Sequence, residues 1–189
     1  MKLVVGLGNP GEEYKLSRHN TGFTMLDFIL GKVDWGESSG TKALFYKDKQ
    51  VEYLKPLTFM NNSGNAVSYV VAKHKVPLKD IVVIYDDIDL PIGKMKISYD
   101  KSSGGHNGLE SVIKKLKSRE FLRIRIGISP ATPSGKIRKP KGEKAVLQFL
   151  LGEYKKNELA ELKKLGKIVK EALETILTEG KEKAMSLYN

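Results

Sequence analysis

Histidine and aspartate side chains suited to acid–base chemistry lie beside short apolar runs of this sequence. His19 lies in SRHN and His106 in SGGHNG, both polar loop segments next to predicted strand ends. Asp86 begins the acidic end of IYDDID, where an apolar strand leaves the predicted sheet. A neutral imidazole can take a proton from water, and a carboxylate can orient the ring. A structural role stays an alternative for each histidine, and His74, on the polar side of a helix, is expected at the surface.

Several other reaction classes lack their characteristic residues. The chain has no cysteine, which excludes disulfides, thiolate zinc sites, iron–sulfur clusters and cysteine nucleophiles. It contains neither a GxSxG elbow nor an HExxH helix. Histidines with carboxylates permit a metal site, but no spacing supports one. Water activated by a base is therefore the simplest hydrolytic chemistry that this sequence can provide.

Asparagines add hydrogen-bonding groups to the same kind of loop. A carboxamide can donate to a developing oxyanion and accept from a water molecule. Asn9, Asn20, Asn61 and Asn107 all lie in loops that contain glycines, which favours a role at a site. Asn62, next in FMNNSG, has the simpler alternative of capping a helix.

The segment GLGNPG at 6–11 matches the GxGxxG pattern of dinucleotide-binding proteins. Its context differs, because Pro10 interrupts the segment and the helical period begins only near Thr21. We interpret the glycines as forming a sharp turn at the carboxyl end of a strand, which would direct Asn9 into a site. A nucleotide-dependent oxidoreductase stays an alternative that would require nicotinamide binding.

The elements that must position these residues alternate between strands and helices. Strands are predicted at 3–7, 80–87, 94–99 and 121–129, with a hairpin at 43–56. Helices are predicted at 21–33, 65–75, 108–117, 144–152 and 157–180. The most continuous apolar run, 80–87, is expected inside the sheet with both faces covered. This order predicts a single-domain α/β fold with a mixed sheet.

Composition and charge limit the classes of protein and of partner that are possible. A chain of 189 residues with 40% hydrophobic and 29% charged residues is typical of one globular domain. No apolar run reaches bilayer thickness and the N-terminus lacks a signal peptide's apolar region, so we expect a cytoplasmic protein without membrane contact. The net charge is +11, and residues 114–144 alone carry 11 basic and two acidic side chains. A polyanionic partner is the first hypothesis, with a solvated lysine surface as the alternative.

Five separated motifs follow one another in a characteristic order. They are VGLGNPGEEYKLSRHNTGF at 5–23, KPLTFMNNSGNAV at 55–67, YDDIDLPIGKMK at 85–96, GGHNGLESVI at 104–113 and FLRIRIGI at 121–128. In these motifs the sequence resembles the bacterial-type peptidyl-tRNA hydrolase family over essentially the whole chain. The resemblance implies hydrolysis of the ester between a peptide and the 3′-terminal ribose of tRNA, which returns free tRNA to translation.

The resemblance also implies roles for individual residues. His19 matches the general base of the family, Asp86 its orienting carboxylate and Asn61 the asparagine that positions water or stabilises the oxyanion. Positions that grip the substrate's peptide and the 3′ end of tRNA match Asn9 and Asn107. The surrounding substrate-binding shell matches Tyr14, Phe59, Met60 and His106.

Contacts to tRNA phosphates are expected from basic residues. Family members often carry basic residues after the LPxG segment, where this chain has KMKISYDKSSGG. The candidates for the 5′ phosphate here are Lys96, Lys101 and Arg125. Lys139 and Lys141, in the basic segment, are expected to meet the acceptor and T stems through backbone charge and shape.

The implied fold is a single-domain three-layer sandwich over residues 1–189, with a mixed twisted β-sheet flanked by helices. The resemblance further implies a monomer that needs no cofactor, metal or obligate protein partner. A mobile lid corresponds to about 130–145, the proline-rich and glycine-rich segment that has no packing period of its own. The alternative function is a non-catalytic RNA-binding protein on the same fold.

Overall fold

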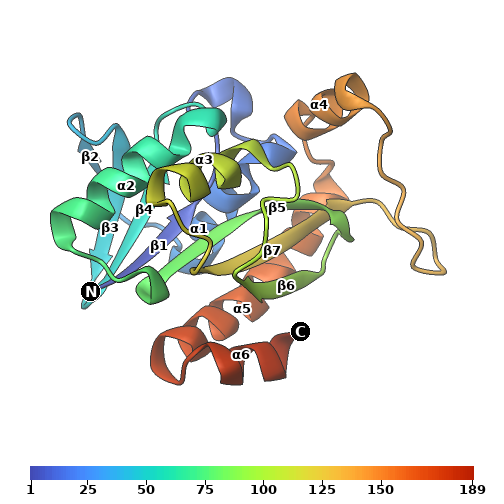
Figure 1. Ribbon diagram of the computed structural model, residues 1–189. Helices are drawn as coiled ribbons and strands as arrows, with labels where there is room; N and C mark the ends of the chain where they lie inside the picture. Colours follow the sequence, from blue (N-terminus) through green and yellow to red (C-terminus); the bar gives the residue numbers. More distant parts are fainter.

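The computed structural model describes all residues, 1–189, and is built on one seven-stranded mixed sheet (Figure 1). The strands lie in the order β2-β3-β4-β1-β5-β7-β6. Four of them, β4, β1, β5 and β7, run parallel to one another, while β2, β3 and β6 pair antiparallel with their neighbours. Their bounds are β1 Lys2–Gly6, β2 Gly36–Ser38, β3 Ala43–Asp48, β4 Val51–Pro56, β5 Ile81–Pro91, β6 Met95–Tyr99 and β7 Leu122–Ser129.

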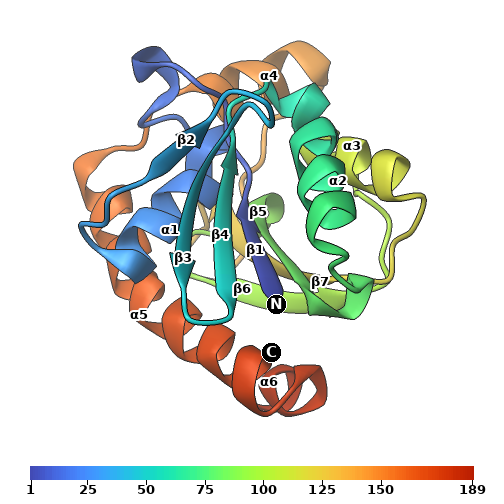
Figure 2. The same cartoon turned by 90° about the vertical axis from the view of Figure 1, so that its left-hand side faces the viewer.

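Helices cover both faces of the sheet, so the predicted three-layer α/β sandwich is confirmed (Figures 1 and 2). Helices α2 and α3 lie on one face, and α1 and α5 on the other. The α-helices are α1 Thr21–Leu30, α2 Ser63–His74, α3 Asn107–Leu116, α4 Glu143–Leu151, α5 Lys156–Thr178 and α6 Lys181–Tyr188. Single 3-10 turns are η1 Glu12–Tyr14, η2 Arg18–Asn20, η3 Met60–Asn62 and η4 Leu78–Asp80.

Alternation along the strands supplies two separate apolar cores. In β1, Leu3 and Val5 belong to the core under α2 and α3, whereas Val4 belongs to the core under α1 and α5. Successive side chains of a strand point to opposite faces, so a strand with helices on both sides must be apolar throughout. The continuous run at 81–85 in β5 meets this condition, and its predicted interior position between β1 and β7 is confirmed.

Several boundaries differ from the sequence prediction. The short edge strand β2 was not predicted, and β5 continues through the acidic run to Pro91 with a register shift between Asp87 and Pro91. A further helix, α6, follows Gly180, where the last helix was expected to end. Strand β2 has only three residues, too few to show a period, and pairs with the nearby β3. The end of β5 pairs with β7, and α6 packs against α5 and β6, contacts that local periodicity does not report.

Arg123, in strand β7, is a charged residue that is fully buried. Its guanidinium donates hydrogen bonds to the backbone oxygens of Ser102, at 2.9 Å, and Arg119, at 3.3 Å. It also lies over the Phe121 ring, 4.8 Å from its centre. The cation is tolerated inside because carbonyl oxygens and an aromatic face replace part of its hydration.

The connection from β7 to α4 extends away from the body of the molecule (Figure 1). It contains one antiparallel bridge, between Ala131 and Ile137, and α4 begins at Glu143. The lid expected at about 130–145 therefore consists of this connection and the first turn of α4. Its mobility stays a prediction. No helix of the molecule combines the length and the apolar character of a transmembrane span.

Candidate active site

The candidate site lies where β1 and β5 end, side by side, at the same edge of the sheet. Parallel neighbours bring their carboxyl ends together, which is where open α/β sheets place their ligands. The loop after β1 carries Asn9, the buried part of strand β5 carries Asp86, and the 3-10 turn η2 carries His19. His106 comes from the position just before α3.

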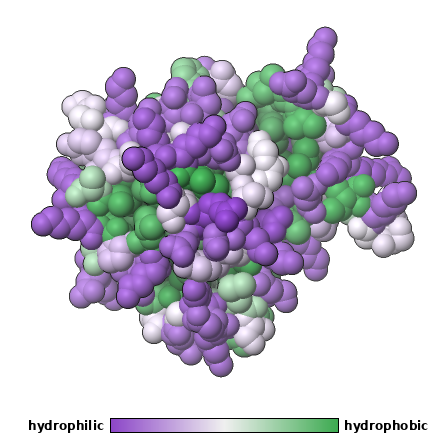
Figure 3. Space-filling view, in the orientation of Figure 1, coloured by the Kyte–Doolittle hydropathy of each residue, from purple (hydrophilic) through white to green (hydrophobic).

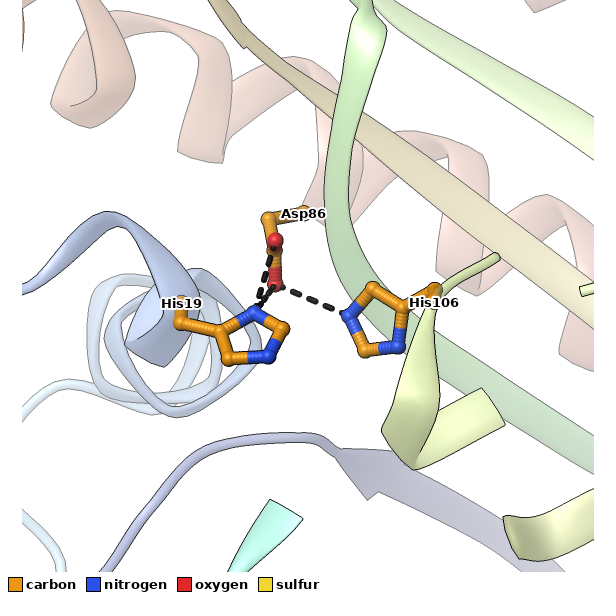
Figure 4. A group of neighbouring side chains, drawn as sticks. All are labelled: His19, Asp86 and His106. Atoms are coloured by element: carbon orange, nitrogen blue, oxygen red, sulfur yellow. Dashed lines mark hydrogen bonds and ion pairs between the residues drawn. The ribbon is translucent and has the colours of Figure 1, made fainter. Parts of the chain in front are cut away.

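His19 and Asp86 are in direct contact (Figure 4). The Nδ1 atom of His19 lies 2.9 Å from one carboxylate oxygen of Asp86 and 3.1 Å from the other. Both side chains are nearly buried, at 6% and 2% exposure. With the proton on Nδ1 donated to this carboxylate, the Nε2 atom of His19 is left as an acceptor.

Asp86 is shared with a second imidazole, that of His106 (Figure 4). The Nε2 atom of His106 lies 3.1 Å from the Oδ1 atom of Asp86. Its Nδ1 atom accepts the backbone N–H of Leu109 at 3.1 Å and so caps α3. Because Nδ1 must be unprotonated to accept, the proton of His106 is on Nε2 and is donated to Asp86. The start of α3 thereby selects the tautomer that holds the carboxylate.

The charges of these groups are strongly coupled. Burial alone would raise the pKa of Asp86, but the two imidazoles and their hydrogen bonds hold it well below its usual range. For His19, burial alone would lower the pKa, but the charge and hydrogen bond of Asp86 outweigh burial and raise it above its ordinary value. Asp86 is therefore ionised at neutral pH, and it stabilises the protonated form of His19.

An asparagine pair supports the loop that carries Asn9. The backbone N–H of Asn9 donates to Oδ1 of Asn20 at 2.8 Å, and Nδ2 of Asn20 donates back to the Asn9 carbonyl at 2.9 Å. The Oδ1 atom of Asn9 accepts the backbone N–H of Met60 at 2.8 Å. Its Nδ2 group has no protein partner, so it is available as a donor. Sequence reasoning placed Asn20 among the asparagines of glycine-containing loops but assigned it no role.

The glycines before Asn9 permit close packing more than turning. A Cβ atom on Gly6 would lie 2.5 Å from the backbone oxygen of Gly22 at the start of α1, and one on Gly8 would lie 2.7 Å from the Phe23 ring. Of the three glycines in segment 6–11, only Gly11 has a positive φ, of 112°. The interpretation of Gly6 and Gly8 as turn-forming residues is therefore wrong. They let α1 approach the sheet closely enough to place η2 and His19 beside β5.

The remaining predicted shell lies around η3. Met60 is buried, Phe59 is 58% exposed, and the Tyr14 and Phe59 rings meet edge to face with centres 6.4 Å apart. Asn61 is exposed, and its side chain makes no hydrogen bond within the protein. Asn107, also exposed, lines the cleft beside His106. The structure thus brings His19, Asp86 and His106 into contact, while Asn61 has no contact that joins it to them.

These side chains open into a cleft of about 310 Å³. Its floor contains His19, Asp86 and His106, its rim the loop 101–105, and one wall Val146 and Leu150 of α4. A buried base that opens into such a cleft is typical of an enzyme site.

Comparisons with known proteins agree with this geometry. A family model described as peptidyl-tRNA hydrolase matches residues 3–189. The chain belongs to the peptidyl-tRNA hydrolase family. It is 45% identical to a peptidyl-tRNA hydrolase of Thermotoga sp. (strain RQ2), covering 99% of this chain and 96% of that protein. It is 41% identical to one of Trichodesmium erythraeum, covering 100% and 88%. These matches confirm the resemblance noted in the sequence.

The fold agrees with that of a solved member of the family. The crystal structure of peptidyl-tRNA hydrolase from Acinetobacter baumannii superposes with a TM-score of 0.88 at 26% identity, covering 100% of this chain and 94% of that one. Family membership and fold together support the catalytic interpretation over the non-catalytic alternative.

Basic residues expected to meet phosphates in this family member lie near the cleft but differ in their partners. Arg125 lines the cleft, with its Nε 2.5 Å from Asp87, and Lys101 lines it without an ion pair. Lys96 is exposed opposite Arg125 in the β6–β7 register. In the connection before α4, Lys139 pairs with Asp89, whereas Lys141 is exposed and makes no ion pair.

The three ligand-type atoms of His19, Asp86 and His106 lie within 4.8 Å of one another, close enough for a metal ion. Each imidazole lies within hydrogen-bonding distance of the carboxylate. Hydrogen bonds therefore explain why the three side chains meet, and we assign no metal role to them.

Proposed function

We propose that this protein hydrolyses the ester between a peptide and the 3′-terminal ribose of tRNA, with His19 as the general base. The observation that carries the proposal is the 2.9 Å contact of His19 Nδ1 with a buried, ionised Asp86. This contact leaves the Nε2 atom of His19 free to accept a proton from water. Membership of the peptidyl-tRNA hydrolase family supports this choice of ester. We also propose that the protein acts in the cytoplasm as a monomer, without a cofactor or an obligate protein partner.

In this mechanism His19 and Asp86 activate water. The Nε2 atom of His19 takes a proton from a water molecule as its oxygen attacks the ester carbon of the peptide. Asp86 stabilises the imidazolium that forms, and His106 keeps the carboxylate in position by donating from Nε2. When the tetrahedral intermediate collapses, the ribose oxygen leaves and takes the proton from His19. The products are a free peptide carboxylate and a tRNA with its terminal hydroxyl restored.

Two asparagines have the free groups that the reacting carbonyl needs. The Oδ1 atom of Asn9 accepts the backbone N–H of Met60, which orients the carboxamide, and its Nδ2 group makes no hydrogen bond within the protein. The exposed carboxamide of Asn61 also makes no hydrogen bond within the protein. We assign Asn61 to water positioning or oxyanion stabilisation, and Asn9 with Asn107 to gripping the peptide and the 3′ end of tRNA. Tyr14, Phe59 and Met60 complete the substrate-binding shell.

The tRNA body is proposed to lie along the basic rim. Lys101 and Arg125 are placed to meet a phosphate near the 3′ end, with Lys96 beside them. Lys139 and Lys141 extend this charge along the lid, at about 130–145, toward the acceptor and T stems. Backbone charge is common to all tRNAs, so such contacts would not restrict the enzyme to one sequence.

The test is the release of tRNA from a purified N-blocked aminoacyl-tRNA, with a chelator present and no cofactor added. We expect free tRNA to appear with the wild-type protein and essentially none with His19→Ala. Binding of the substrate without release would instead support the RNA-binding alternative. A requirement for nicotinamide would support the oxidoreductase alternative.

A further inference from the structure

Helix α4 borders the cleft but has little packing of its own. None of its nine residues is fully buried. Apolar side chains are exposed over it in Figure 3. Leu147 of this helix is 53% exposed. The main element that it packs against is η2, the turn that carries His19. A helix with so small a buried surface depends on a few specific contacts for its position.

Arg18, next to His19 in η2, makes those contacts. Its guanidinium carbon lies 4.6 Å from the centre of the Phe149 ring of α4 and 5.3 Å from that of Tyr154. Its Nη2 atom donates to Glu158, near the start of α5, at 2.9 Å. Only 8% of Arg18 is exposed, so these attractions act with little water between the groups.

The backbone around Arg18 is joined to the same region. Its N–H donates to the carbonyl of Gly152, which follows α4, at 3.1 Å, and Tyr154 N–H donates to Leu16 at 3.0 Å. The Tyr154 hydroxyl lies 2.6 Å from Thr21 Oγ1. The segment between α4 and α5 is therefore fixed on both sides of Arg18. Within α4, Phe149 stacks on Arg18, and Phe149 and Leu150 also pack against the apolar core under α1 and α5.

This stack lies next to the cleft, between residues that neighbour its floor and its wall. Val146 and Leu150, the neighbours of Phe149 on α4, form one wall, and His19, the neighbour of Arg18, lies in the floor. If Phe149 lost its partner, the wall could move away from the base while the His19–Asp86 contact stayed intact. Substrate binding would then weaken more than the chemical step.

We infer that Arg18 is a positioning residue that holds the α4 wall of the cleft at a defined distance from His19 through its stack on Phe149. The inference rests on the proposed function, because its kinetic test measures hydrolysis of the tRNA ester. A planar guanidinium can stack on a ring and pair with a carboxylate at once. The ammonium of a lysine is a compact charge that would keep the pairing with Glu158 but lose the flat contact.

The experiment compares Arg18→Lys, Phe149→Leu and the double variant. With an N-blocked aminoacyl-tRNA as substrate, we expect each single variant to raise KM roughly 3- to 10-fold, with kcat changed less than about twofold. The double variant should be no worse than the poorer single variant, because both remove one interaction. In the full-length variants, hydrogen–deuterium exchange should accelerate at amides 143–151 and not in the central strands.

A matched control removes another cation stacked on a ring, far from α4. The ammonium of Lys181, at the start of α6 (Figure 1), lies 3.5 Å from the centre of the Tyr99 ring. Lys181→Ala removes this ammonium and should leave KM unchanged. An unchanged KM, a loss confined to kcat, or additive effects in the double variant would overturn the inference. If Arg18→Lys fails to fold, Phe149→Leu alone decides through the same two readouts. Failure of the wild-type protein to release tRNA would contradict the proposed function instead.

Discussion

At the scale of single residues, the contact between His19 and Asp86 carries the proposed chemistry. A positioned base typically contributes a rate factor of ~10²–10⁴, and one oxyanion donor ~10²–10³. We therefore expect His19→Ala to abolish nearly all turnover and Asn61→Ala to leave measurable activity, both with native folding by circular dichroism. His74, expected at the surface, is half-buried at the end of α2 beside Glu52 and outside the cleft, so His74→Ala serves as the control and should be fully active. Turnover close to wild type in His19→Ala would rule out its assignment as the base.

The ionisation of His19 predicts the direction of the pH dependence. Only the neutral imidazole can accept a proton, so kcat should fall as the pH drops through the pKa of His19, which Asp86 raises above its ordinary value. In Asp86→Asn the carboxylate charge is lost and burial dominates, so the midpoint should move to lower pH as the plateau falls. The measurement is kcat from about pH 5 to 9. A flat wild-type profile, or an unmoved midpoint in Asp86→Asn, would contradict this assignment.

At the scale of the elements, close helix packing brings the loops of the site together. A Cβ atom on Gly64 in α2 would lie 2.2 Å from the backbone oxygen of Ser111 in α3. Backbone cannot move aside cheaply, so Gly64→Ala should lower the free energy of unfolding by about 1–3 kcal/mol. Gly40→Ala is the matched control, since a Cβ there meets nothing within 4 Å. Urea denaturation measures both, and equal midpoints would show that α2 and α3 can separate without cost.

At the scale of the whole molecule, the net charge of +11 and its concentration in residues 114–144 predict salt-dependent tRNA binding. Each lost phosphate contact should lower the slope of log affinity against log salt by roughly 0.7–0.9. Replacing Lys139 and Lys141 by Glu should therefore weaken binding and flatten this slope, measured by fluorescence anisotropy. The control makes the same charge change at Lys181 and Lys183 of α6, at the opposite end from α4 (Figure 1). Equal slopes in both double variants would exclude the lid from the tRNA surface.

The sequence by itself determined most of the elements and the type of fold. Three features follow from the periodicity of neighbouring residues and could be predicted. They are the alternation of strands and helices, the apolar run that forms β5, and the hairpin that makes the sheet mixed. The family motifs also identified His19, Asp86 and Asn61 as candidates. Edge strand β2, the end of β5 and helix α6 were not predicted. Three residues are too few to show a period in β2, whereas the end of β5 is paired with β7 and α6 packs against α5 and β6.

Only the tertiary structure decided how the candidate residues meet. His19 and Asp86 are 67 positions apart, and they touch because β1 and β5 are parallel neighbours and glycines let α1 approach them. Sequence reasoning gave His106 a place in the shell but did not show that it shares Asp86 or that α3 selects its tautomer. It gave no role to Arg18, because a cation in a polar loop resembles a surface residue. The Arg18 guanidinium can be buried because it contacts Phe149 and Glu158. Glu158 is 140 positions away in the sequence, so only folding brings it next to Arg18.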